Sequence, residues 1–366
     1  MIRSLVIAVV VLSAGVASAY PQFQLSRDQT CTGCHLSPAG GGPLNENGMT
    51  MIEGLSQFGT NPQFFYDALG TPSWLTLGGD LRAAGGFNSA PFKSLVGIPM
   101  QGEIYAHATY KNFSLYLNVG ARPSENGNEA ATHGWSREHY LQWQQNPGET
   151  DGLFVRVGRF MPVFGLRFAE HPDYTRQFGG TQLYSETYGV AVEYIAPKWE
   201  VHGTGFIKDP IIDPVAHDNG GAVYGEYRLT DKLSVGGEGM ITKSDDDKKY
   251  RAGITSKFYI PGPDILLQGE LQFVNQVIDA GGAPKQLVGY LLASWFVKSF
   301  LVDVGIGDDN ENLRIKDLDR DCVDLNLHWF ATSHVELIWN NRYELIGLGQ
   351  GGPSGAYSLL QLHYRL

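Results

Sequence analysis

The feature that most constrains this chain is an alternation of apolar and polar residues that begins near Trp74 and continues to the last residue. Successive side chains of a β-strand point to opposite faces, so a period of two predicts strands with one apolar and one polar face. The alternation is clear in residues 100–110, 113–121, 199–207, 233–241, 250–260, 265–273, 323–329 and 358–366.

These segments predict an all-β fold, an antiparallel transmembrane β-barrel of about sixteen strands with roughly ten residues each. Alternation alone would also suit a β-sandwich, but a dry sandwich core would not accept charged side chains. Aromatic residues near strand ends and a chain that ends on a strand also favour a barrel. The ionisable residues on the polar face are Glu103, Glu193, Glu200, Glu238, Arg251, Lys257, Glu270, Asp324, Glu336 and Arg342.

The connections between the predicted strands alternate in length. Short links such as Lys111-Asn112 alternate with long polar stretches such as residues 122–134. Outer-membrane barrels have short turns on the periplasmic side and long loops outside the cell. The amino-terminal segment is therefore expected at the periplasmic mouth of the barrel.

The first nineteen residues have the pattern of a secretory signal peptide. Arg3 precedes a short apolar run, and Ala17-Ser18-Ala19 forms a small-residue cleavage site before Tyr20. The alternative, an uncleaved anchor, would need an apolar run of about 20 residues. The net charge of −11 argues against nucleic acid as a partner, because phosphates require clusters of Lys and Arg.

The second informative feature is the pentapeptide Cys31-Thr32-Gly33-Cys34-His35, which matches C-x-x-C-H. Two thiols at this spacing can each form a thioether to one haem vinyl group, and the adjacent His35 can bind the iron. The motif has two alternative interpretations. A redox disulfide is expected within a βαβ unit, which the sequence does not predict here, and a zinc half-site would need two further ligands nearby. The sequence therefore predicts one covalent haem c. The third cysteine, Cys322, is expected to be inert.

Residues 20–70 differ in character from the predicted barrel at 71–366. They are rich in Gly and Pro and contain one predicted helix, Glu46 to Phe58, in which Met49, Ile52 and Leu55 share a face. About fifty residues bury little core alone, so this segment is expected to be a small haem-wrapping cap that packs on the barrel.

The segment from Tyr20 to about Phe58 resembles the monohaem c-type cytochrome segment found before outer-membrane barrels in many Gram-negative bacteria. The likeness rests on the Tyr20–Gln24 run, the C-x-x-C-H motif and the Leu44-Asn45-x-x-Gly48 element. The resemblance implies that Cys31 and Cys34 attach the haem and that His35 is the proximal ligand. It does not assign the distal ligand.

Several residues are candidates for the sixth position on the iron. A His/Met pair would raise the reduction potential, although Met49 or Met51 could equally pack in the helix face. The mature amino terminus resembles the start of cytochrome f, where the terminal amine ligates iron. A histidine of the predicted lumen is the third option. The candidates are Met49, Met51, the α-amine of Tyr20, His107, His202 and His328.

Residues 157–166 (Val-Gly-Arg-Phe-Met-Pro-Val-Phe-Gly-Leu) resemble a strand and turn of phosphate-selective porins. Those porins select anions with Lys and Arg, whereas the predicted lumen here mixes both signs, so anion selectivity does not follow.

The leading hypothesis is an outer-membrane cytochrome that transfers electrons at the periplasmic side, with outer-membrane lipid and a periplasmic or extracellular redox partner. One haem does not span a hydrocarbon layer of about 30 Å. The alternative is a solute porin whose haem-bearing segment is a plug or a redox-sensitive gate. An enzyme is not expected, since it would need an open iron site. Such barrels often form homo-oligomers, and a homo-oligomer is possible here, although the sequence does not identify an interface.

Overall fold

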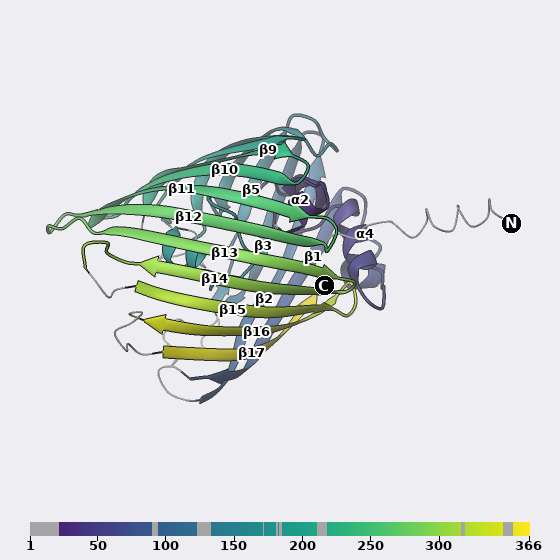
Figure 1. Cartoon of the computed structure of the whole chain (residues 1–366). Coiled ribbons are helices and arrows are strands. Elements are labelled where there is room, and N and C mark those ends of the chain that lie inside the picture. Colours follow the sequence, from purple (N-terminus) through teal and green to yellow (C-terminus); the bar gives the residue numbers. More distant parts are fainter. Residues whose placement is uncertain are drawn as a thin grey trace.

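The protein is a closed antiparallel β-barrel with a small helical segment at one end (Figure 1). The computed structural model describes residues 22–89, 94–122, 133–170, 172–180, 182, 185–210, 218–315, 319–346 and 354–366. The predicted signal peptide and Tyr20 lie outside these residues. Among the described helices, none is long and apolar enough to cross a bilayer.

The amino-terminal segment holds α2 (Gln22–Ser26), α3 (Cys31–Cys34), α4 (Glu46–Leu55) and the 3₁₀ turn η1 (Phe64–Asp67). A π-helical turn, η2 (Thr175–Gly179), lies between two strands. The strands are β1 (Leu75–Asn88), β2 (Ser94–Tyr110), β3 (Phe113–Arg122), β4 (His133–Trp135), β5 (His139–Gln144), β6 (Gly152–Phe160), β7 (Thr187–Ala196), β8 (Trp199–Ile207), β9 (Asn219–Thr230), β10 (Leu233–Lys243), β11 (Asp247–Ile260), β12 (Ile265–Ile278), β13 (Lys285–Val297), β14 (Phe300–Asn310), β15 (Asp319–Phe330), β16 (Val335–Ile346) and β17 (Ser354–Arg365).

Apart from β4 and β5, each strand pairs with its neighbours in the chain, and β17 pairs with β1 to close the barrel. The short strands β4 and β5 both pair with β3 and share one position around the wall. The seventeen strands of the described residues therefore occupy sixteen positions. The prediction of a sixteen-strand antiparallel barrel is confirmed.

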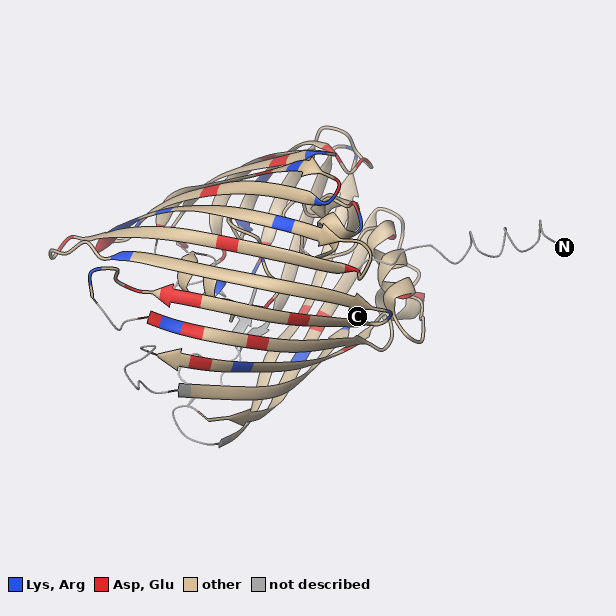
Figure 2. Cartoon of the chain, in the orientation of Figure 1, with Lys and Arg blue, Asp and Glu red and all other residues tan. Residues whose placement is uncertain are grey.

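The two faces of the wall differ as the alternation predicts. Apolar residues face outward, as Ile104 and Leu115 show with 57% and 56% exposure. The polar residues between them face the lumen, where Glu103 and His107 are buried. Figure 2 shows acidic and basic residues interspersed along the strands instead of separated into one acidic and one basic region.

The amino-terminal segment closes one end of the barrel, which we call the plug end. The helices α2 and α4 and the C-terminus lie together there (Figure 1). Two-residue turns such as Lys111-Asn112 link strands at this same end. The predicted helix to Phe58 ends earlier, at Leu55, because the chain then leaves it to bond the barrel. The amides of Gln57 and Phe58 donate to carbonyl oxygens of residues 330 and 331 at 2.9 and 3.0 Å.

A second segment, the internal loop, lies between β6 and β7, and its described residues (161–170, 172–180, 182 and 185–186) fold into the lumen. The amide of Leu166 donates to Glu270 of β12 at 3.1 Å, and the Tyr174 hydroxyl donates to Glu344 of β16 at 2.7 Å. Since β12 and β16 are remote from β6 around the wall, the internal loop reaches across the lumen. It occupies part of the lumen.

Candidate functional site

The C-x-x-C-H motif forms a single helical turn at the plug end. The amide of His35 donates to the carbonyl oxygen of Cys31 at 2.9 Å and ends the turn. The sulfur of Cys31 accepts a bond from Gln24 Nε2 at 3.0 Å, and the Cys34 thiol contacts Met51 Sδ at 3.3 Å. The two sulfurs are not joined in a disulfide. The turn places two thiols and one imidazole on a short, ordered stretch.

Burial raises the pKa of the Cys31 and Cys34 thiols to about 11, although Arg167 acts in the opposite direction on Cys31. Redox C-x-x-C motifs instead have a lowered thiol pKa. In the described part of the chain, no three or more His, Cys, Asp or Glu side chains are placed to hold a metal ion. The donor set fits haem attachment better than the redox alternative.

Three successive glycines follow the motif, and the first of them brings bare backbone against it. Gly40, Gly41 and Gly42 have φ values of +77°, +70° and +61°, a region that favours glycine. A Cβ on Gly40 would lie 3.6 Å from Cys31 Sγ and 4.0 Å from His35 Cδ2. A side chain at Gly40 would fill the space beside the thiol and the imidazole. A flat cofactor would need that space.

The Leu44-Asn45-x-x-Gly48 element holds the motif in place. The side chain of Asn45 donates to Thr32 O at 2.8 Å and accepts from Gly48 N at 2.9 Å, which caps α4. Asn47 Nδ2 donates to Gly33 O at 2.7 Å. Gly48 packs directly on the Cys34 carbonyl, so a Cβ there would overlap that oxygen. Asn45 and Asn47 thus position α3 on α4.

The motif opens onto a cavity of about 680 Å³ inside the barrel. Ligand pockets generally range from about 300 to 1,000 Å³. The cavity extends from the plug to the internal loop, and residues of β1 to β3 and of β15 to β17 complete its wall. Its lining includes Cys31, Cys34, His35, the three glycines, Met49, Tyr105, Tyr116 and Arg167.

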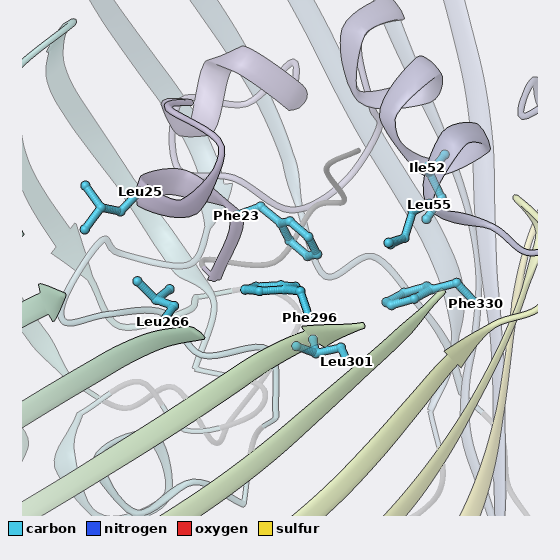
Figure 3. Close-up of a cluster of buried hydrophobic side chains, with 8 residues drawn as sticks. All are labelled: Phe23, Leu25, Ile52, Leu55, Leu266, Phe296, Leu301 and Phe330. Atoms are coloured by element: carbon cyan, nitrogen blue, oxygen red, sulfur yellow. The ribbon is translucent and has the colours of Figure 1, made fainter. Parts of the chain in front are cut away.

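The plug is attached to the barrel by an apolar cluster (Figure 3). The tilted rings of Phe23 and Phe296 pack with their centroids 4.8 Å apart, and Leu55 of α4 lies in the same cluster as Phe330. Burial of such side chains contributes roughly 1.5–3 kcal/mol each. The full cluster comprises Phe23, Leu25, Ile52, Leu55, Leu266, Phe296, Leu301 and Phe330.

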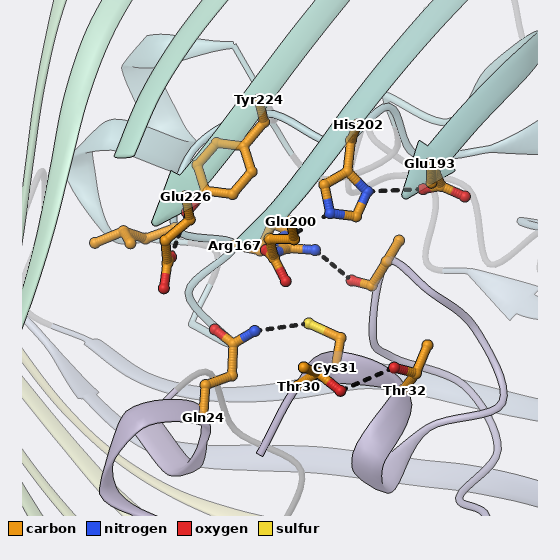
Figure 4. Close-up of polar contacts among 12 residues, drawn as sticks. Gln24, Thr30, Cys31, Thr32, Arg167, Glu193, Glu200, His202, Tyr224 and Glu226 are labelled. Carbon is orange, nitrogen blue, oxygen red and sulfur yellow. Dashed lines mark hydrogen bonds and ion pairs between the residues drawn. The ribbon is translucent and has the colours of Figure 1, made fainter. Parts of the chain in front are cut away.

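Buried polar bonds attach the plug beside Cys31 (Figure 4). Lys257 Nζ of β11 donates to Gln24 Oε1 at 2.5 Å and to Glu226 Oε2 at 2.6 Å. Arg167 of the internal loop donates to Ala39 O at 3.1 Å and to Glu200 Oε1 at 2.7 Å. The plug, the internal loop and the wall are therefore joined around one thiol.

The candidates for the distal ligand differ in their surroundings. Met49 lines the cavity, whereas Met51 contacts Cys34 and packs against the apolar cluster. His202 and His328 are hydrogen-bonded to carboxylates, at 3.0 Å from Glu193 and Glu336 respectively. His107 has no such contact. The α-amine of Tyr20 lies outside the described residues.

Sequence reasoning missed three parts of the site: the internal loop, the role of Gln24 and the bonds of Asn47. The Gly-Arg-Phe stretch of residues 157–166 forms the end of β6 and the start of that loop. Arg159 of this stretch forms an ion pair with Asp209 at 2.8 Å, so its side chain stabilises the barrel wall. The chain turns into the lumen at Gly165, which has a φ of +71°. Its backbone approaches the Glu270 carboxylate so closely that a Cβ would overlap it.

The fold is similar to those of solved outer-membrane proteins. OmpT of Vibrio cholerae superimposes with a TM-score of 0.62 at 11% identity, over 81% of this chain and 99% of that one. An anion-selective porin from Comamonas acidovorans gives 0.61 at 15% identity, over 80% and 99%. OprB of Pseudomonas putida gives 0.57 at 12% identity, over 80% and 94%.

No protein-family model matches the sequence, and no curated protein matches it. At identities of 15% or less, the likeness establishes the porin-like barrel fold alone. The OmpT of Vibrio cholerae is also described in a trimer form, with a TM-score of 0.59.

Proposed function

We propose that this chain is an outer-membrane barrel that carries one covalent haem c at its periplasmic mouth and transfers single electrons there. The observation that carries the proposal is that Cys31, Cys34 and His35 all line one cavity. When bound, the haem would supply one-electron chemistry at its iron.

The residues that would hold the cofactor have separate roles. Cys31 and Cys34 would form the two thioethers, and His35 would be the proximal ligand. The glycine run would keep the cofactor face clear of side chains, and Asn45 would hold the turn on α4. The apolar cluster would keep the whole segment on the wall.

The electron balance requires two partners. A periplasmic one-electron carrier protein would give one electron, which reduces ferric to ferrous iron. A small redox-active solute in the lumen would take that electron and return the iron to the ferric state. The lumen is a reasonable place for the acceptor because the cavity extends from the motif to the internal loop.

The proposed location is the outer membrane of a Gram-negative bacterium, with the plug end toward the periplasm. Support comes from the outward apolar residues, the two-residue turns at the plug end and the likeness to outer-membrane barrels. Assembly as a homo-oligomer is also proposed, by analogy with the trimer form of OmpT. We propose no enzymatic activity.

The test uses full-length protein matured with its signal peptide and inserted into liposomes. A reduced one-electron carrier protein and a small redox dye, both added on the side of the liposome that the plug end faces, should exchange electrons, seen as dye reduction, only if the haem is present. The matched control is the double variant Cys31→Ala/Cys34→Ala, which should insert equally but transfer no electrons. Equal dye reduction by both proteins, or by neither, would refute electron transfer.

A solute porin is the second candidate, because the solved relatives in fold include porins. In this reading the haem-bearing segment is a plug or a gate. Single-channel conductance separates the two functions. Ion conductance that changes with the oxidation state of the haem would favour a gate, and unchanged conductance in Cys31→Ala/Cys34→Ala would favour a plain porin.

A further inference from the structure

The wall of the cavity carries a second group of polar side chains where the barrel closes. β1 pairs with β17 on one side and with β2 on the other. Arg82 of β1 lies opposite His363 of β17 and Gln101 of β2, and Ala84 lies opposite Gln361 of β17. Arg82 and Gln361 are therefore diagonal neighbours, typically about 7–8 Å apart and within reach of long side chains.

Both side chains face the cavity that also contains the C-x-x-C-H motif, because Arg82 and Gln361 line it. The strand beside them is irregular. The register of β1 and β2 shifts after Arg82, so that Met100 is an extra residue on β2. Pro99, Met100 and Gln101 all line the cavity, whereas regular strands alternate their faces. Bulges of this kind re-aim side chains and are frequent next to binding sites.

The donors of Arg82 and Gln361 are not satisfied by the described residues. Gln361 is 2% exposed, and its Nε2 has no hydrogen-bond partner there. The Arg82 Nε is also buried without a partner, and no described acid forms an ion pair with this guanidinium. Buried polar groups of native proteins are almost always hydrogen-bonded. Two neighbouring unpaired donors in one cavity therefore require an explanation.

The acids beside Arg82 in the sheet are bonded to other groups. Asp80, two residues earlier on β1, is 2.7 Å from His363 Nε2. Glu103 of β2 accepts a hydrogen bond from Asn118 Nδ2 at 2.6 Å. An arginine carries its charge at every physiological pH and has no acceptor atom. The partner that would satisfy Arg82 is therefore an anion or another acceptor that enters the cavity.

Apolar side chains border the two donors. Ala84 follows Arg82 on the same face and lies opposite Ile98 of β2. Leu359 precedes Gln361 on the same face of β17, and all three apolar residues line the cavity. A ligand that reaches both donors can therefore place an apolar body on these side chains. A planar guanidinium presents two parallel N–H bonds that match the two oxygens of a carboxylate.

We propose that Arg82 and Gln361 form a binding site for a small organic acid. Its carboxylate would accept two hydrogen bonds from Nε and one Nη of Arg82, and a third from Gln361 Nε2. This binding site goes beyond the proposed function. Its extension to the electron acceptor, which would then be a carboxylate with an apolar body, rests on that function.

The carboxylate site lies deeper in the lumen than the plug. A Cβ on Gly42 of the plug would lie 3.2 Å from the Tyr116 hydroxyl, and the Tyr116 ring is 6.3 Å from that of Tyr105. Tyr105 lies opposite Gly78 of β1, and Arg82 is four residues farther along this strand. Four residues of a strand span about 13 Å. A solute at Arg82 would thus bind beyond the part of the wall that contacts the plug.

The test is the binding of benzoate to full-length mature protein in detergent, measured by isothermal titration calorimetry, with benzamide as the neutral probe of similar shape. Wild type should bind benzoate more tightly than benzamide. Arg82→Gln should weaken benzoate binding by about 10- to 150-fold, because it removes hydrogen bonds between charged groups. Gln361→Glu should weaken it as well, because the introduced carboxylate would itself occupy the guanidinium. The control Arg314→Gln removes the same charge at an exposed position and should bind as wild type does.

Three results would overturn the inference: wild type that does not bind benzoate, equal affinity for benzoate and benzamide, or equal benzoate affinity of wild type and Arg82→Gln. If Arg82→Gln does not fold, the nearly isosteric Gln361→Glu decides, and an unchanged benzoate affinity refutes the site. Haem content is measured on the same samples. Haem-free mature protein that binds benzoate would refute the proposed function and support the carboxylate site, whereas haem-loaded protein that does not bind it would refute the site alone.

Discussion

Replacing Lys257 with Met tests how the plug is held in the barrel. The Lys257 ammonium lies in the wall under the plug, where it bonds Gln24 and Glu226, and its side chain is 1% exposed. Without it, Glu226 keeps only the bond from the Tyr224 hydroxyl at 2.7 Å. Removing one partner of a buried pair costs about 3–5 kcal/mol. When the plug is released, water can hydrate the Glu226 carboxylate. The unpaired charge therefore destabilises the docked state relative to the released state.

A loss of about 3–5 kcal/mol in Lys257→Met would raise the fraction of molecules with a released plug by about two to three and a half orders of magnitude. Trypsin measures that population, because Arg27 is the only Lys or Arg in residues 22–73. In the docked state Arg27 forms a bidentate ion pair with Asp264 at 2.8 Å. Cleavage after Arg27 should therefore accelerate in Lys257→Met by up to this factor when release is faster than cleavage.

The double variant Lys257→Met/Glu226→Gln is the matched control, because it removes the unpaired charge together with its partner. Cleavage should slow again toward the wild-type rate. If single and double variants are cleaved at equal rates, or if Lys257→Met behaves as wild type, then the buried pair does not hold the plug.

Two further substitutions test the packing of the plug. Phe330→Ala should weaken docking by about 3–5 kcal/mol, seen as faster trypsin cleavage, whereas Tyr110→Ala on the outer surface should leave the rate unchanged. Gly48→Ala should force α4 away from the Cys34 carbonyl at a cost of about 1–3 kcal/mol and lower the haem bound per polypeptide. Gly59→Ala, whose Cβ would meet nothing nearer than 4.0 Å, should keep the wild-type haem content, and equal losses in both variants would contradict the packing argument.

The barrel was predictable because its wall repeats one local rule. In residues 113–121, for example, every second side chain must face the outside of the barrel, and the structure places Leu115 and Leu117 outward. The strand positions could be counted for the same reason. The end of α4 was not predictable, because it depends on amide bonds from Gln57 and Phe58 to a turn almost 300 residues away.

The internal parts of the site also depend on contacts remote in sequence. Gln24 and Lys257 are 233 positions apart, and nothing in either local sequence indicates that they meet. The period of two places His107, His202 and His328 equally in the lumen. What distinguishes them is whether a neighbouring strand supplies a carboxylate, as Glu336 does for His328. That difference exists only once the strands are paired.

Covalent attachment of haem can be read from the intact mass of the mature protein under denaturing conditions, together with its absorption spectrum before and after reduction. We expect a mass increased by one haem, a c-type spectrum, and loss of both in Cys31→Ala/Cys34→Ala. A colourless protein with the mass of the bare polypeptide, from cells that attach haem to other c-type cytochromes, would contradict covalent attachment.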